Sequence, residues 1–270
     1  MSPAGLVIRA SEMELGALAL TDHDTMDGLP SFIAAPAPEW LTRVPGVEMS
    51  TDHGNQEVHI LGYYVPVFSP TLKKWLGEQQ RSRAERFPKM VARLRDLGIN
   101  IDASVLNRVL TGVKSPGRTH LARAVVEAGH AGSIDEVFDI YLEKGRPAYV
   151  DREKVTTEEA ISILRRVGSV PVLAHPLQLD MEDLYAFMKE MKRHGLMGVE
   201  THYMYAPGEA KSQTNVESLA EELGLIQTGG SDFHEDNGHC GIGGMTVDAE
   251  TVARLQNTAR GLTRQLSNEG

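Results

Sequence analysis

The chain has 270 residues, 41% hydrophobic and 24% charged, which is enough for one barrel-sized domain or two small ones. Its formal net charge of −10 argues against binding to duplex DNA, because attraction to phosphates needs a basic surface, but it leaves open a small phosphorylated substrate held through metal ions. The single cysteine, Cys240, cannot close an intrachain disulfide, and no apolar run approaches the roughly 18 residues of a membrane span, so we expect a cytoplasmic protein that does not contact membranes.

Short apolar runs alternate with amphipathic segments along most of the chain. The runs predict strands at residues 17–20, 44–49, 58–64, 170–174, 197–200 and 225–228. The amphipathic stretches 181–193 and 209–223 carry Lys, Glu and Arg on one face, as surface helices do. This alternation is typical of a parallel α/β fold.

The block from residue 69 to 143 breaks the alternation, since it is long, charged and helix-periodic without a convincing strand. We predict a helical insertion or cap over residues 69–147. Residues 1–68 and 148–270 would then form the strand-containing domain.

Side chains that bind metals follow or lie within the predicted strands. In a parallel barrel or doubly wound sheet the carboxyl ends of the strands meet on one face, so such side chains are expected to converge in space. The six candidates are His23, Glu48, His59, His175, Asp232 and His234.

Each candidate taken alone has an ordinary explanation. His23 lies between two aspartates in a turn that continues into Asp-Gly, and Glu48 has the position of an exposed acid at a strand end. The coincidence of all six is harder to explain in this way. "GGSDFH" is the most telling segment, because Asp232 and His234 can reach toward two neighbouring metals.

A set of imidazoles and carboxylates without thiolates suits Zn, Mn or Fe, and a carboxylate such as Glu48 can bridge two ions. Paired divalent ions lower the pKa of a bound water and hold the oxygens of a phosphoryl group during displacement. The pattern therefore predicts hydrolysis by metal-activated water.

The segments "LALTDHDTMDGL", "PGVEMS", "EVHILGY", "VLAHP" and "GGSDFH" resemble, in this order, successive motifs of the polymerase and histidinol phosphatase (PHP) family of metal-dependent phosphoesterases. The segments "GRTHLARAVVEAGH" and "YLEKGRPAYV" resemble most the subgroup that hydrolyses nucleoside 3',5'-bisphosphates and short RNA 5' ends. The resemblance implies an α/β fold, a distorted (β/α)7 barrel with a helical insertion. It also implies a centre of two to three divalent ions (Mn, Zn or Fe) and a nucleotide or short oligonucleotide as substrate.

The resemblance also implies roles for the six candidates. Glu48 would bridge two metal ions. The other five would complete the centre as follows: Asp232 at the first ion, His59 and His175 at the second, and His23 and His234 at the third.

Further residues would act on the substrate. Arg118 and His120 in "GRTH" match positions where the subgroup contacts phosphate, and Arg146 is a weaker candidate; helix capping and surface charge are the plain alternatives. For catalysis we expect Asp22, His23 and His234. In this scheme Asp22 and Asp24 orient the His23 ring, or Asp22 relays a proton.

The start of the chain departs from the family pattern. Family members begin with a strand that carries His-x-His, followed by an Asp, whereas this chain begins with Ser2 as a helix N-cap and Pro3 as the first helical residue. Six strands are predicted where the resemblance implies seven. Either Met1 is an internal methionine of a longer protein or the chain is a true truncation, and both readings predict a poor catalyst.

Two other functions stay open at this stage. A histidinol phosphate phosphatase would share the metal ligands and differ in its pocket. A degenerate family member would bind metal or nucleotide without catalysis, but the intact "TDHD", "AHP" and "SDFH" argue against it.

Overall fold

The computed structural model describes residues 1–54, 56–111, 113, 116–150, 155–205, 208–234 and 240–269. They belong to two units, the first formed by Met1–Trp75 with Lys154–Gly270 and the second by Leu76–Glu153. No helix in the described part of the chain is both long enough and apolar enough to cross a membrane.

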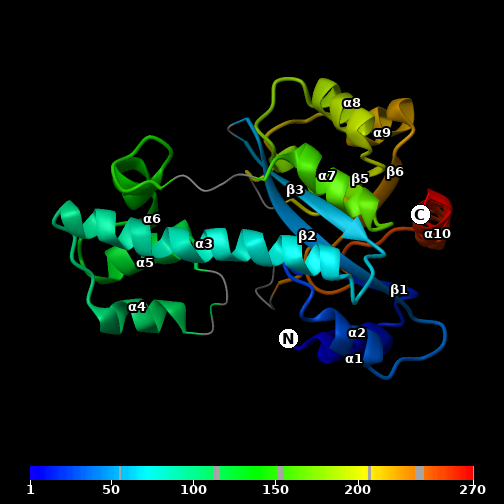
Figure 1. Ribbon diagram of the computed structural model, residues 1–270, viewed down its shortest axis with the longest axis horizontal. Coiled ribbons are helices and arrows are strands. Elements are labelled where there is room, and N and C mark those ends of the chain that lie inside the picture. Colours follow the sequence, from blue (N-terminus) through cyan, green and yellow to red (C-terminus); the bar gives the residue numbers. More distant parts are fainter. Residues whose placement is uncertain are drawn as a thin grey trace. The chain divides into compact units, whose positions relative to one another are not determined.

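The first unit is built on one curled, half-barrel sheet whose six strands lie in chain order (Figure 1). The strands are β1 (Ala17–Leu20), β2 (Thr42–His53), β3 (Gln56–Tyr63), β4 (Val170–Leu173), β5 (Gly198–Tyr203) and β6 (Ile226–Gly230). All six fall on the predicted apolar runs: β1 matches at both ends, and the ends of the other strands differ by at most four residues.

The sheet is mixed: neighbouring strands are parallel, as the alternation of strands and helices indicates, except at β3. This strand runs antiparallel to both β2 and β4, whereas β1 with β2 and β4 with β5 and β6 are parallel pairs. The cause is local: β2 ends at His53 and β3 begins at Gln56, so the connection is too short for the crossover that a parallel pair requires. Gly54, with φ +60°, supplies the left-handed turn.

Helices surround the sheet, and the side chain before the first helical residue caps several of them. They are α1 (Pro3–Glu12), α2 (Leu29–Ala34), α7 (Thr157–Arg166), α8 (Leu184–His194), α9 (Val216–Leu223) and α10 (Ala249–Glu269), with a 3-10 turn η2 at Pro176–Gln178. Ser2 caps α1 by accepting a hydrogen bond from the Gly5 N–H, as predicted. The helix predicted over residues 209–223 begins only at Val216, because Asn215 caps it by accepting from the Ser218 N–H.

The two faces of the sheet are covered differently. Cross-strand partners share a face, so the register places Glu48, Leu61 and Val172 on one side, which we call the inner face. Toward one end this face is apolar and packs against α10 through Leu255, Ala259 and Leu262. On the opposite, outer face α7 lies against the sheet, with Leu164 over Gly62. The polar end of the inner face is therefore the part left for a site.

The second unit is helical in its described residues and contains no strand there, as its sequence periodicity predicts. Its elements are α3 (Pro70–Asp96, which starts in the first unit), α4 (Ala103–Leu110), α5 (Arg118–Glu127), α6 (Ile134–Val137) and a π-helical turn η1 (Phe138–Leu142). Leu94, Leu121, Val125 and Leu142 form its core. The role of this unit as a cap stays a prediction.

Close contact between β5 and β6 gives a test of the fold. A Cβ at Gly229 would collide with the backbone carbonyl of His202, beside a register shift between Glu200 and His202. We expect Gly229→Ala to lower the free energy of unfolding by about 1–3 kcal/mol, measured by urea denaturation. Gly77→Ala is the matched control: it lies within α3 with open space around it, and should be neutral or stabilise by up to about 1 kcal/mol. Equal effects of the two substitutions would contradict this packing.

Candidate metal centre

The centre of the site is the carboxylate of Glu48, which lies in the middle of β2 and is buried. Nδ1 of His59 lies 2.9 Å from its Oε1, and Nε2 of His175 lies 3.2 Å from the same oxygen. Nε2 of His23 lies 3.6 Å from the other oxygen, Oε2. Three imidazoles from different parts of the sequence thus converge on one carboxylate.

The sheet register explains how His59 and His23 reach Glu48. In the β2–β3 hairpin Glu48 pairs with Leu61 and Ser50 with His59, so Glu48 and His59 project from the same face. The chain after β1 continues alongside β2, where the Asp24 N–H donates to the Glu48 carbonyl at 2.7 Å and the Glu48 N–H donates to the Asp22 carbonyl at 3.2 Å. Between them, His23 is held opposite Glu48.

His175 is positioned by an unusual backbone conformation at the end of β4. Its φ of +27° is rare for a residue other than glycine, and such strain persists only where neighbouring groups enforce it. The His175 N–H donates a hydrogen bond of 2.9 Å to Oε2 of the buried Glu200, on β5. This bond helps to hold the turn that brings the His175 ring to 3.1 Å from Nδ1 of His59.

Asp232 and His234 complete the group from the segment after β6. Asp232 also has a positive φ, +45°, and its carboxylate accepts a hydrogen bond of 3.0 Å from the Tyr203 hydroxyl. The His234 ring lies 5.7 Å from the His23 ring, centroid to centroid, and its Nδ1 is 2.8 Å from the Asp232 carbonyl oxygen. All six predicted ligands therefore lie in one connected cluster.

The candidate ligands reach the site from two kinds of position, as predicted. His23, His175, Asp232 and His234 follow strands, and Glu48 and His59 lie inside β2 and β3. The antiparallel β3 brings His59 to the site from the opposite direction, which a purely parallel scheme does not anticipate.

The charges in the cluster are strongly coupled. Burial disfavours the ionised form of Glu48, but hydrogen bonds with His175 and His59 outweigh it and hold the pKa of Glu48 well below its usual range. Burial likewise opposes protonation of His59, yet hydrogen bonds with Glu48 and Glu57 raise its pKa to about 10. Burial, reinforced by the charges of Glu48 and Asp232, raises the pKa of Glu200 to about 8.

The donor set fits divalent metal ions. Ligand atoms of His23, Glu48 and His59 all lie within 4.8 Å of one another, and neighbouring donors stand about 3 Å apart, as ligands that are each ~2 Å from one ion do. Within the described part of the chain, the buried Nδ1 of His175 has no hydrogen-bond partner. Imidazole and carboxylate donors without thiolate suit Zn, Mn or Fe.

Sequence reasoning missed Glu200, which lies on the same face as Glu48 and beside the same pocket. A signal was present: the tripeptide Gly-Val-Glu ends in Glu48 and recurs at residues 198–200, each time on a predicted strand. It also missed the contact between Asp24 and Ser50. The Asp24 carboxylate accepts hydrogen bonds from the backbone N–H (3.0 Å) and hydroxyl (3.1 Å) of Ser50, which ties the loop after β1 to β2.

The residues predicted to contact phosphate lie in the second unit. Arg118 begins α5, with its guanidinium 5.5 Å from the Phe138 ring and 5.8 Å from the Tyr149 ring. Nδ1 of His120 accepts from the Gly117 N–H at 3.2 Å, which is the capping role named as its plain alternative. Arg146 is exposed. Their roles toward substrate stay predictions.

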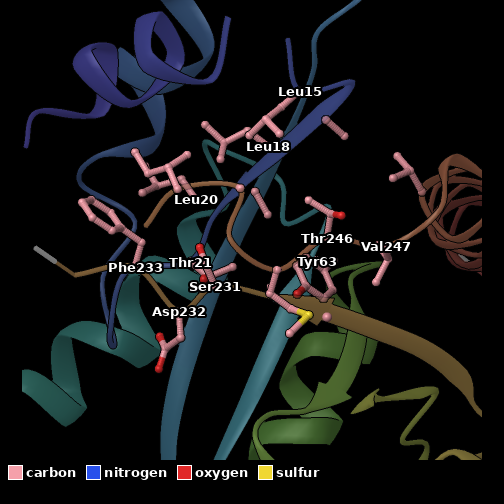
Figure 2. Close-up of a pocket in the computed structure, with 18 of the residues that line it drawn as sticks. Leu15, Leu18, Leu20, Thr21, Tyr63, Ser231, Asp232, Phe233, Thr246 and Val247 are labelled. Atoms are coloured by element: carbon pink, nitrogen blue, oxygen red, sulfur yellow. The ribbon is translucent and has the colours of Figure 1, made fainter. Parts of the chain in front are cut away.

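A pocket of about 1040 Å³ opens beside the cluster, large enough for a nucleotide-sized ligand (Figure 2). His23, Glu48 and Asp232 contribute to its polar part. Residues 17–21 line it consecutively, on β1 and just beyond, rather than in alternation, which shows that the free edge of β1 faces the pocket. Leu18, Leu20 and Phe233 make this region apolar, as the close-up shows.

Known proteins share both sequence and fold with this chain. It is 34% identical over 247 residues to the 5'-3' exoribonuclease Rnm of Escherichia coli K12, covering 87% of this chain and 80% of the relative. It is 29% identical to a 3',5'-nucleoside bisphosphate phosphatase of Chromobacterium violaceum, covering 94% of this chain and 89% of the relative. No family model matches the chain.

Two solved structures confirm the barrel-type architecture. A protein of Bifidobacterium adolescentis described as a metal-dependent phosphoesterase superposes with a TM-score of 0.73 at 26% identity, covering 95% of this chain and 91% of its own. An amidohydrolase of Chromobacterium violaceum, solved with bound sulfate and no metal, superposes with a TM-score of 0.76 at 28% identity, covering 96% and 92%.

The bond from His175 to Glu200 yields a prediction. Glu200→Ala leaves the buried His175 N–H without its acceptor, so we expect a loss of about 1–3 kcal/mol in unfolding free energy and metal binding weakened about 10- to 100-fold. Glu200→Gln keeps an acceptor oxygen and should retain most of both. Urea denaturation and titration with Mn²⁺ measure the two effects. Equal metal affinity in the Ala and Gln variants would show that Glu200 does not position His175.

Proposed function

Because this chain belongs to the PHP family of metal-dependent phosphoesterases, and its relatives are hydrolases, we propose that it hydrolyses a phosphate ester of a small nucleotide. The substrate would be a nucleoside 3',5'-bisphosphate or the 5' end of a short RNA; one relative is named a 3',5'-nucleoside bisphosphate phosphatase and another a 5'-3' exoribonuclease. The observation that carries the proposal is the convergence of His23, His59 and His175 on Glu48 beside a nucleotide-sized pocket.

The positions of the side chains around Glu48 also suggest which of them would hold each metal ion. Glu48 would bridge two ions, and His59 with His175 would hold one of them, since both rings face its Oε1. Asp232 would serve another ion, and His23 with His234 a third, because their rings lie together. Two to three divalent ions bound here would activate a water and neutralise the phosphoryl oxygens, with Mn, Zn or Fe as the candidates.

The protein's own groups would hold the reactants and move protons. In hydrolysis water adds to phosphorus, the ester P–O bond breaks, and the leaving oxygen takes up a proton. When only two ions are bound, Nε2 of His234 carries no ion, and His234 is then our candidate donor of that proton: its side chain is 58% exposed, and the Asp232 carbonyl at its Nδ1 fixes the ring. Asp22 would orient His23 or relay a proton from it.

Arg118, His120 and Arg146 would bind a phosphate of the substrate. Support for Arg118 comes from its place at the start of α5 and from the nearby rings of Phe138 and Tyr149, whose faces attract the guanidinium. Bound sulfate in the amidohydrolase relative shows that a related fold accepts a tetrahedral anion. The acidic net charge of this chain favours a small substrate over duplex DNA.

Metal removal and ligand substitution test the function. We expect a chelator to abolish hydrolysis of a nucleoside 3',5'-bisphosphate and Mn²⁺ to restore it, and Asp232→Ala to lower turnover at least about 100-fold. His130→Ala, an exposed imidazole of the second unit, is the control and should leave turnover unchanged. Retained turnover in Asp232→Ala would sink the assignment. The assay should include a 5'-phosphorylated short RNA and histidinol phosphate, the substrates of the alternative assignments.

Arg118 can be tested separately. Arg118→Ala should raise KM for the bisphosphate about 10- to 100-fold, the worth of a charged hydrogen bond, with a smaller effect on kcat. The KM of Arg118→Lys should lie between those of the parent and Arg118→Ala, because lysine keeps the positive charge but lacks the planar set of donors of a guanidinium. If Arg118 only supports Phe138 and Tyr149, the Ala variant will unfold at a lower temperature with an unchanged KM.

A further inference from the structure

A second group of metal-type ligands lies on the outer face of the sheet in the first unit, where α7 and α8 pack together. Glu158 belongs to the first turn of α7, and Glu190 and His194 lie one turn apart on α8. One ligand atom from each of these three side chains lies within 4.8 Å of the other two.

A fourth donor comes from β2. Nδ1 of His53, the last residue of that strand, lies 3.5 Å from Oε1 of Glu158. The His53 ring packs edge-on against the buried ring of Phe187, with centroids 4.9 Å apart. Phe187 precedes Glu190 by three residues on α8, so the ring that orients His53 shares a helix face with Glu190. Three elements therefore bring two imidazoles and two carboxylates together.

No basic side chain other than imidazole pairs with the carboxylates of this group in the described part of the chain. Glu158 lies beside His53, and neither Glu158 nor Glu190 forms an ion pair with a Lys or Arg there. Two carboxylates at this separation repel each other. A divalent cation would satisfy both carboxylates and use the imidazole lone pairs.

We propose that His53, Glu158, Glu190 and His194 form a binding site for a divalent cation, separate from the centre at Glu48. Two imidazoles and two carboxylates without thiolate are a donor set that zinc accepts in tetrahedral sites, so Zn²⁺ is the ion we assign. The ion would join the end of β2 to α7 and α8. It would lie on the face of the sheet opposite to Glu48, which projects from the inner face.

The test counts zinc ions on the full chain. The chain is stripped with a chelator, titrated with Zn²⁺ against a chromophoric chelator, and analysed for bound zinc. Glu190→Gln with His194→Asn should remove one zinc equivalent, or weaken one at least 10-fold, and leave the other equivalents and hydrolytic activity unchanged. Glu48→Gln should have the opposite effect. It should weaken zinc binding at the Glu48 cluster and leave the zinc equivalent bound by Glu190 and His194 unchanged.

Two controls keep the outcome decisive. Glu217→Gln with His130→Asn changes an exposed carboxylate and an exposed imidazole outside the group, and should bind as the parent does. Thermal unfolding without zinc shows whether the double variant still folds. If it does not fold, zinc binding is measured on His53→Gln instead. This variant should lower the affinity of the proposed site for Zn²⁺. Unchanged zinc number and affinity in a folded variant would overturn the site and leave the four side chains as a solvated surface group.

Discussion

The structure of the site depends on the buried carboxylate of Glu48. Burying an ionised carboxylate costs free energy unless charged or hydrogen-bonding partners replace the water. Here the partners are His59 and His175, with His23 near the second oxygen. None of these is close to Glu48 in sequence except His59. The hairpin, the loop after β1 and the turn after β4 must all be in place before the carboxylate is satisfied, so folding and assembly of the site are one process.

The sequence predicted the strands and six candidate ligands that the structure brings together, because apolar runs that contain or precede His, Asp and Glu carry both signals at once. It did not predict strand direction at β3, although the short connection from His53 to Gln56 contained that information. Glu200 was not predicted as a site residue because a single acid at a strand end has many explanations. Only its hydrogen bond with the His175 N–H, which depends on the fold, connects it to the site. Contacts such as Asp24 with Ser50 depend on tertiary placement and leave no local pattern.

Left-handed backbone conformations recur around the cluster. Asp24, His175 and Asp232 all have positive φ, with values of +50°, +27° and +45°. Each is at the turn that follows a strand, and each is fixed by a neighbour: Ser50, Glu200 and Tyr203 in that order. Such conformations cost about 1–3 kcal/mol for most side chains. The protein thus gives up stability to aim these side chains, which is what a preorganised site requires.

The two outer strands have a further consequence. In the described part of the sheet β1 and β6 each pair on one side only, and the His23 and His234 rings meet beyond their ends. Edge strands open more readily than central ones, because fewer hydrogen bonds must break. Fraying there would release His23, Asp232 and His234 while Glu48, His59 and His175 stay in position. If the proposed ions bind as assigned, those held by His23, Asp232 and His234 would exchange with solvent faster than the ion held by His59 and His175, so the centre would lose its ions in stages.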